Sequence, residues 1–255
     1  MPVFSLALSG VRGFHAASER QAVTAIFITA TGANVGTTFI AAALIRHLRQ
    51  MGHQVDAIKP IVSGYDAGQA AASEPALLLA ALGVAFSPEA VDSISPWRFR
   101  GGLSPDLAAQ REGRDIDVDQ VIAFCRGAVD KRRDILLIEG LGGIMVPLDE
   151  ERTILDVMMT LRVPLILVTG SYLGAVSHTL TALDALFRRD MNILATIVSE
   201  TPNSPVPLDD VVASIARFTD PVLGVPHSKW SGGNAGSASF GRLFSGRPPR
   251  TPDAG

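Results

Sequence analysis

The stretch TAIFITATGANVGTT, residues 24–38, combines three patterns that together decide the fold. Residues 24–29 are an apolar run with β-branched and aromatic side chains, which predicts a buried strand. Residues 32–36 begin and end with glycine and predict a turn, and residues 37–51 have the periodicity of a helix. A strand, a glycine-containing turn and a helix in this order predict a cradle for an anion, because the first N–H groups of the helix face the turn.

Strand and helix patterns alternate along the rest of the chain. Further strands are predicted at residues 55–58, 134–138, 164–169, 193–198 and 222–225. Helices are predicted at residues 75–82, 106–111, 118–129, 153–161, 173–189 and 208–218, with an irregular stretch that contains Pro88, Pro96 and Pro105. Strands that alternate with helices over short links form parallel sheets with right-handed crossovers. The fold class is therefore α/β, a single doubly wound parallel sheet with helices on both faces.

Composition excludes several classes of protein. Hydrophobic residues make up 47% of the chain and charged residues 18%, but the apolar runs are far shorter than the roughly 20 residues that a membrane span needs. Such short runs are typical of strands covered on both faces. The net charge is −3 and there is no basic tract, so nucleic acid is not expected as a partner. The single cysteine, Cys125, is predicted to be an inert core thiol, and the cytoplasm is the expected compartment.

The two ends of the chain are expected to lie outside the folded domain, which spans residues 23–230. Residues 1–22 have no sustained period and predict a disordered extension, or a start assigned too early with Val23 as the true beginning. A basic presequence is a weaker alternative, because this stretch contains an acidic residue and no cleavage signature. Residues 231–255 are rich in Gly, Ser, Pro and Arg, which predicts a disordered tail.

The turn at residues 32–36 departs from the usual phosphate-binding loop. Gly36 allows the backbone to approach a phosphate, and the Thr38 hydroxyl is placed to bind Mg²⁺. The residue before that threonine is normally lysine, and here it is Thr37. Loss of one positioned donor to transition-state charge costs on the order of 3–4 kcal/mol, or roughly 10²- to 10³-fold in rate. An ordinary tight turn between a strand and a helix is therefore an equal alternative on this segment alone.

A lysine elsewhere can supply the missing charge. Lys59 follows the second predicted strand, so it lies beside the turn if the first two strands are neighbours. The chain has only two other lysines, Lys131 and Lys229, and Pro60 fixes the backbone next to Lys59. These observations favour a role in phosphate binding over a solvated surface lysine.

Two carboxylates are candidate metal ligands. Glu139 ends the third predicted strand and precedes Gly140, Leu141 and Gly142, and a carboxylate at that point suits direct or water-mediated Mg²⁺ coordination. The alternative is an exposed glutamate beside a glycine turn. Glu74 precedes a helix, where an acidic side chain is favoured by the helix dipole alone, so for Glu74 the two explanations are nearly equal.

Taken together, the motifs resemble those of the dethiobiotin synthetase family. The matching segments run in order across residues 23–230: IFITATGANVGTT, IKPIVSG, SPWRF, LSPDLAAQREGR, LLIEGLGG with VPL, LILVTGSYLGAVSHTLTAL and LGVP. The resemblance implies a P-loop NTPase-like fold, ATP and Mg²⁺ as cofactors, and a homodimer. It implies that the chain closes the ureido ring on 7,8-diaminopelargonate with CO₂ and ATP, in biotin biosynthesis.

The family's site residues carry over onto this chain by motif. The resemblance makes Lys59 the catalytic lysine, and Thr38, Glu74 and Glu139 the Mg²⁺ ligands. It implies a nucleotide site formed by Asn34, Val35, Gly36, Thr37, Thr38, Phe39, Glu74, Glu139, Gly140, Leu141 and Gly142. It implies a substrate site formed by Ser63, Leu173, Gly174 and Ser177, with the last three capturing the substrate carboxylate across the dimer interface.

Three departures from the family pattern leave alternatives open. Thr37 replaces the loop lysine, Asn34 replaces a common acidic residue, and Ser199 with Glu200 stands where many members have an asparagine that contacts adenine. A nucleotide-binding homologue with weak or no turnover is therefore the main alternative. A partitioning-type or cobyrinate-amidating ATPase is less favoured, because Ser63 and the segment LSPDLAAQREGR do not fit that class. His178 is interpreted as a packing residue rather than a base.

Overall fold

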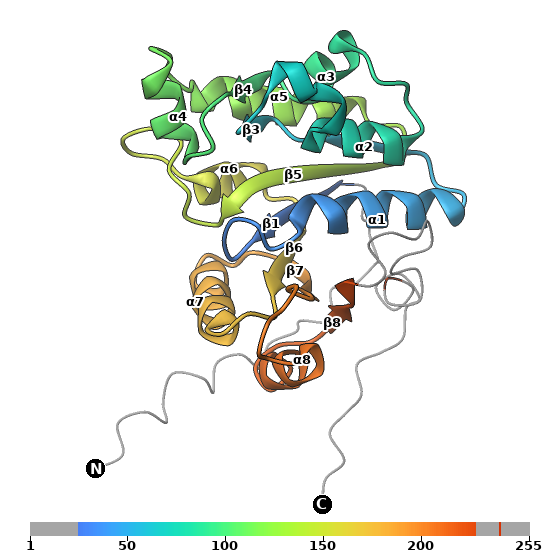
Figure 1. Ribbon diagram of the computed structural model, residues 1–255, viewed down its shortest axis with the longest axis vertical. Coiled ribbons are helices and arrows are strands. Elements are labelled where there is room, and N and C mark those ends of the chain that lie inside the picture. Colours follow the sequence, from blue (N-terminus) through green and yellow to red (C-terminus); the bar gives the residue numbers. More distant parts are fainter. Residues whose placement is uncertain (1–24, 228–239, 241–255) are drawn as a thin grey trace, which may run out of the picture.

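The computed structural model describes residues 25–227 and residue 240, and contains a six-stranded parallel sheet (Figure 1). The strand order is β2-β5-β1-β6-β7-β8, and every pairing is parallel. The strands are β1 (Ala25–Ala30), β2 (Val55–Ile58), β5 (Ile135–Gly143), β6 (Leu165–Gly170), β7 (Ile193–Ser199) and β8 (Val222–Val225). The predicted fold class is confirmed. The predictions for residues 1–22 and 231–255 lie outside the described residues.

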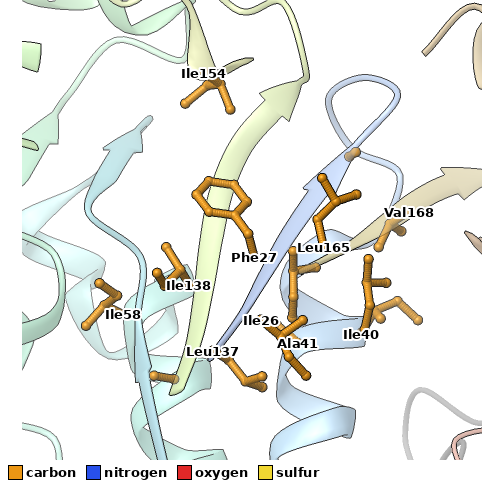
Figure 2. Packing of buried hydrophobic residues seen from close by; sticks show 14 of the residues in the cluster. Ile26, Phe27, Ile40, Ala41, Ile58, Leu137, Ile138, Ile154, Leu165 and Val168 are labelled. Carbon is orange, nitrogen blue, oxygen red and sulfur yellow. The ribbon is translucent and has the colours of Figure 1, made fainter. Parts of the chain in front are cut away.

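Helices cover both faces of this sheet. They are α1 (Thr37–Gln50), α2 (Glu74–Leu82), α3 (Pro88–Ile94), α4 (Pro105–Arg111), α5 (Val118–Lys131), α6 (Ile154–Leu161), α7 (Ala175–Phe187) and α8 (Leu208–Ile215). Successive side chains of β1 point to opposite faces. Figure 2 shows Ile26 near Ile40 and Ala41 of α1, whereas Phe27 points toward Ile154 of α6. Both faces of the strand are therefore buried, which is why its sequence is a continuous apolar run.

A second, two-stranded parallel sheet was not predicted. β3 (Ile61–Ser63) pairs with β4 (Trp97–Phe99), and a 3-10 helix, η1 (Ala67–Ala72), follows β3. The stretch interpreted as irregular thus contains α3 and β4. Pro88 does not break a helix there but occupies its first position, where a missing N–H costs nothing, and the Ser87 side chain accepts a hydrogen bond from Ala90 N.

Two details of the main sheet also differ from expectation. β5 lies between β1 and β2, so the expectation that the strand ending at Lys59 neighbours β1 is wrong. β5 also continues through Gly143 instead of ending at residue 138. Gly140 is required by close packing, because a Cβ there would lie 2.9 Å from Cε1 of Phe27 (ring shown in Figure 2). The central position of β5 places Glu139 between the loop after β1 and the segment after β2.

Candidate active site

The loop between β1 and α1 has the backbone shape of an anion cradle. Gly36 is the N-cap residue of α1 and has φ 87° and ψ 23°, a left-handed conformation that costs an L-residue roughly 1–2 kcal/mol. Asn34 is also left-handed, with φ 58°. No side chain of the described residues caps α1, so its first turn presents backbone N–H groups toward the loop.

Three side chains from three separate segments meet beside this loop. The Thr38 hydroxyl, in the first turn of α1, donates a hydrogen bond of 2.5 Å to Glu139 Oε1 on β5. The Lys59 ammonium, which directly follows β2, lies 2.7 Å from the same oxygen and donates a second hydrogen bond of 3.3 Å to the Gly140 carbonyl. The side chains of Lys59 and Glu139 are only 2% and 1% exposed. The expected convergence of Lys59, Glu139 and Thr38 is therefore present, and Lys59 is not a surface lysine.

Glu74 completes this group from the solvent side. It is the first residue of α2, and its Oε1 lies 3.3 Å from the Thr38 hydroxyl oxygen, whose single proton is directed to Glu139. Its Oε2 lies 3.4 Å from Lys59 Nζ, and the side chain is 45% exposed. The helix dipole explains an acidic residue at this position but not its direction toward Thr38 and Lys59. The geometry therefore favours the interpretation of Glu74 as a member of the site.

Burial and opposite charge set the protonation of this group. Burial lowers the pKa of Lys59, but the carboxylates of Glu139 and Glu74 outweigh it and hold the pKa above its ordinary value. Lys59 is thus an ammonium at neutral pH. Burial raises the pKa of Glu139, so the charge on that carboxyl depends on the cations and donors that face it.

The oxygen atoms of this group suit Mg²⁺. Across residues 25–227 and 240, no cluster of three or more His, Cys, Asp or Glu side chains forms a complete metal cage. Mg²⁺ does not need one, because it usually binds one or two carboxylates together with waters and phosphate oxygens. Glu139 Oε2 is buried and has no hydrogen-bond partner among the described residues, so it is an available hard ligand. Thr38, Glu74 and Glu139 fit the predicted role.

The other predicted nucleotide residues surround this centre. Thr37 is half-buried at the first position of α1, so the structure places a neutral hydroxyl at the point of the usual lysine. Asn34 is exposed, Val35 is buried and Phe39 is half-buried. Leu141 and Gly142 continue β5 past Glu139, with Gly142 at φ 61°. Their roles in nucleotide binding stay predictions.

A second glycine loop joins β6 to α7. Gly174 is the N-cap residue of α7, with φ 98° and ψ −10°, and Leu173 before it is 80% exposed. Ser177 is exposed in the first turn of α7. His178 is exposed too; its Nδ1 lies 2.8 Å from the Tyr172 hydroxyl and its ring packs beside the Tyr172 ring, so it packs at the surface and not in the core. The substrate roles of Leu173, Gly174 and Ser177 stay predictions.

Three further polar side chains lie at the end of β3, after β7 and at the start of α4. Ser63, at the end of β3, is half-buried, and its hydroxyl has no hydrogen-bond partner within the described part of the chain. Glu200, after β7, accepts a hydrogen bond of 2.6 Å from the backbone N–H of His227. Asp106, in the first turn of α4, was not singled out from the sequence, although it lies in the segment LSPDLAAQREGR. One of its carboxylate oxygens is buried without a partner among the described residues.

Comparisons with known proteins identify the family of this chain. Residues 24–228 match the family model described as an AAA domain. An ATP-dependent dethiobiotin synthetase from Methylobacterium nodulans is 43% identical over 200 residues, which cover 76% of this chain and 89% of that protein. One from a Caulobacter species is 44% identical over 213 residues, which cover 82% and 91%. The chain belongs to the dethiobiotin synthetase family. The family predicted from the motifs is thereby confirmed.

Solved structures place this dethiobiotin synthetase family member among P-loop folds. The MinC:MinD complex of Aquifex aeolicus has a TM-score of 0.52 at 12% identity and covers 90% of this chain and 98% of its own. MinD with Mg-ADP from Pyrococcus horikoshii has a TM-score of 0.50 at 16% identity and covers 88% and 90%. At these identities the likeness concerns the fold alone. In the described part of the chain, no helix is both long and apolar enough to cross a membrane.

Proposed function

We propose that this chain is an ATP-dependent dethiobiotin synthetase that forms the ureido ring of dethiobiotin. The substrates are 7,8-diaminopelargonate, CO₂ and ATP. One amine of the diamine takes up CO₂ to give a carbamate, whose oxygen receives the γ-phosphoryl group of ATP. The second amine then attacks the activated carbon, and phosphate leaves as the ring closes. ADP and phosphate are the other products.

The observation that carries this proposal is the buried contact of Lys59 with Glu139 and of Glu139 with Thr38. A buried ammonium and a buried carboxylate are costly to desolvate, and replacing such a pair by apolar residues is often neutral or stabilising. The Lys59–Glu139 pair lies beside an anion-binding loop in a member of this family, so a catalytic role explains it better than a role in stability. The same three groups are those that the motifs assigned to catalysis and metal binding.

The residues of the cluster divide the work of phosphoryl transfer. Mg²⁺, held by Thr38, Glu74 and Glu139, would neutralise charge on the phosphate oxygens. The N–H groups at the start of α1 hold the phosphates, and Gly36 lets the backbone come close to them. The Lys59 ammonium stabilises negative charge on the carbamate and on the transferring phosphoryl group. Because Thr37 carries no charge, Lys59 is the lysine on which the transition state depends.

The substrate is proposed to lie between the end of β3 and the second glycine loop of a partner copy. Ser63 offers a hydroxyl to the diamine near Lys59. The start of α7, at Leu173, Gly174 and Ser177, offers backbone N–H groups to a carboxylate, which helix N-termini bind well. We propose that this loop comes from the second subunit of a homodimer. An enzyme that consumes ATP draws on the cytoplasmic pool, and we place it there.

A nucleotide-binding homologue with weak turnover is the second candidate, and Thr37 is the observation that favours it. Phosphate release from ATP separates the two candidates when it is measured with and without 7,8-diaminopelargonate and bicarbonate. We expect the diamine to stimulate release, and mass spectrometry to detect dethiobiotin in equal amount. Release that the diamine does not stimulate above background overturns the synthetase proposal.

A further inference from the structure

Asp106 has a carboxylate whose burial is not explained by its place at the start of α4. It is the second residue of α4, after Pro105, and one of its oxygens, Oδ1, is buried. That oxygen has no hydrogen-bond partner among the described residues. A buried polar atom without a partner is costly, and a carboxylate oxygen more so, because ionised it accepts hydrogen bonds and donates none. Such an atom in a native protein requires a specific explanation.

A matched position elsewhere in the chain shows how an acidic side chain lies when only the helix dipole favours it. α3 has the same length as α4, begins with proline and also has an acidic second residue, Glu89. Glu89 is exposed, and hydrogen bonds from its own backbone N–H and from Ser87 lower its pKa. That is the ordinary arrangement of an acidic residue in a first helical turn. Asp106 differs because its Oδ1 atom is turned into the protein without a donor.

α4 packs against β3 and β4, and its first turn lies beside the chain that follows β4, which is hydrogen-bonded to the chain that follows β3. The Gly64 N–H donates a hydrogen bond of 2.9 Å to the Gly101 carbonyl. A Cβ on Gly101 would lie 3.7 Å from the Cβ of Ala108, in that turn of α4. Ser63 directly precedes Gly64, and its buried hydroxyl also has no partner among the described residues. Figure 1 shows α4 at the same end of the molecule as the carboxyl end of β5. Two unsatisfied polar atoms therefore belong to adjoining segments on the active-site side.

We propose that the Asp106 carboxylate and the Ser63 hydroxyl form a subsite for an amino group of the substrate. This inference rests on the proposed function and deepens it. A primary amine offers several N–H donors, and a carboxylate and a hydroxyl are the acceptors that match them. Mg²⁺ is a poorer fit, because the subsite contains one carboxylate whereas the cluster at Glu139 contains two. Asp106 is thus a binding residue that orients the diamine toward Lys59 and discriminates against substrates that lack the amine.

Asp106→Asn tests this role because it keeps the shape of the side chain and removes its charge. Hydrogen bonds to charged groups are strong, so we expect the KM for 7,8-diaminopelargonate to rise by about tenfold or more. The KM for ATP and the melting temperature should not change. Glu89→Gln is the matched control, and it should leave both KM values unchanged. An unchanged KM for the diamine in Asp106→Asn overturns the inference, even if kcat falls.

A double-mutant cycle with Ser63→Ala covers the case in which Asp106→Asn also disturbs folding. If both groups contact one amine, the effect of the double variant on diamine affinity will differ from the product of the two single effects. Independent effects contradict a shared subsite. Direct titration of diaminopelargonate measures this without turnover. If the diamine does not stimulate phosphate release by the wild-type protein, the proposed function is refuted. If the wild type is active and Asp106→Asn binds the diamine equally well, only the subsite is refuted.

Discussion

Two loops of this protein have the same backbone conformation at a helix N-terminus but different side chains around them. One joins β1 to α1 and the other joins β6 to α7, the strand next to β1 and its helix. Each loop ends in a left-handed glycine at the N-cap, Gly36 with φ 87° and Gly174 with φ 98°, and no side chain in the described part of the chain caps either helix. Both helix starts can therefore bind an anion through backbone N–H groups.

The difference lies in what other strand ends bring to each loop. Beside the first loop, Lys59 and Glu139 form a buried ion pair that also contacts Thr38. The second loop is held by neutral hydrogen bonds, in which the Ser171 and Thr201 side chains each accept from the other residue's backbone N–H. Its tip, Leu173, is 80% exposed. The two loops thus share a backbone that can bind an anion, but among the described residues only the first has a buried pair of opposite charges beside it.

Lys59→Met removes the charge that distinguishes the first loop, and we expect the largest effect from it. Loss of a positioned transition-state donor should lower kcat by roughly 10²- to 10³-fold. It also leaves Glu139 buried without its cation, which should reduce the free energy of unfolding by about 3–5 kcal/mol. Phosphate-release kinetics and urea unfolding measure the two effects. Lys131→Met, at an exposed position on α5, is the control and should change neither. Normal turnover in Lys59→Met would remove Lys59 from the mechanism.

Glu139→Gln keeps the size and shape of the side chain but removes one of the two carboxylates of the proposed metal site. We expect the Mg²⁺ concentration for half-maximal activity to rise by about 10- to 100-fold, since changes around metal ligands have effects of that size. Titration of Mn²⁺ into protein with ADP gives a readout independent of turnover. Asp156→Asn, which alters the Thr153 cap of α6, is a control for stability loss. An unchanged metal requirement in Glu139→Gln contradicts the role of Glu139 as a ligand.

Thr37→Lys restores the residue that phosphate loops usually carry and sharpens the contrast between the two loops. We expect a rate gain of at least about tenfold, because the added ammonium reaches the phosphates bound at the start of α1. Thr37→Gln adds a long neutral donor and is the matched control, so it should gain little. No gain in Thr37→Lys means that the loop does not hold the phosphates as proposed.

The sequence predicted the loops well because each is a local pattern of strand, glycine and helix. Residues 24–38 contain that whole pattern, and the structure places the strand and helix within one or two residues of the predicted bounds. The meeting of Lys59, Glu139 and Thr38 was also predictable, since the carboxyl ends of parallel strands share one edge. The strand order was not predictable, because nothing in the sequence of β2 indicates that β5 lies between β2 and β1.

The features that were missed are short or depend on tertiary packing. β3 and β4 have three residues each, too few to show a period, and each follows a proline, Pro60 or Pro96. The extension of β5 through its glycines depends on the Phe27 ring beside Gly140, which only the folded structure reveals. His178 lies on the exposed side of α7, and its contact with Tyr172 depends on the course of the loop before that helix.

Gly174→Ala tests the second loop, and we expect the smallest effect on activity from it. A Cβ there has room, because the nearest atom is His178 Cε1 at 4.0 Å, so the cost is the strain of a left-handed alanine, about 1–2 kcal/mol. Gly52→Ala is the matched control, since Gly52 has φ +92° and open space around it but follows the carboxyl end of α1. Both variants should lose similar stability. Only Gly174→Ala should raise the KM for 7,8-diaminopelargonate, by a few-fold, with the KM for ATP unchanged. Equal kinetics in the two variants would show that this loop, despite its likeness to the first, binds no part of the substrate.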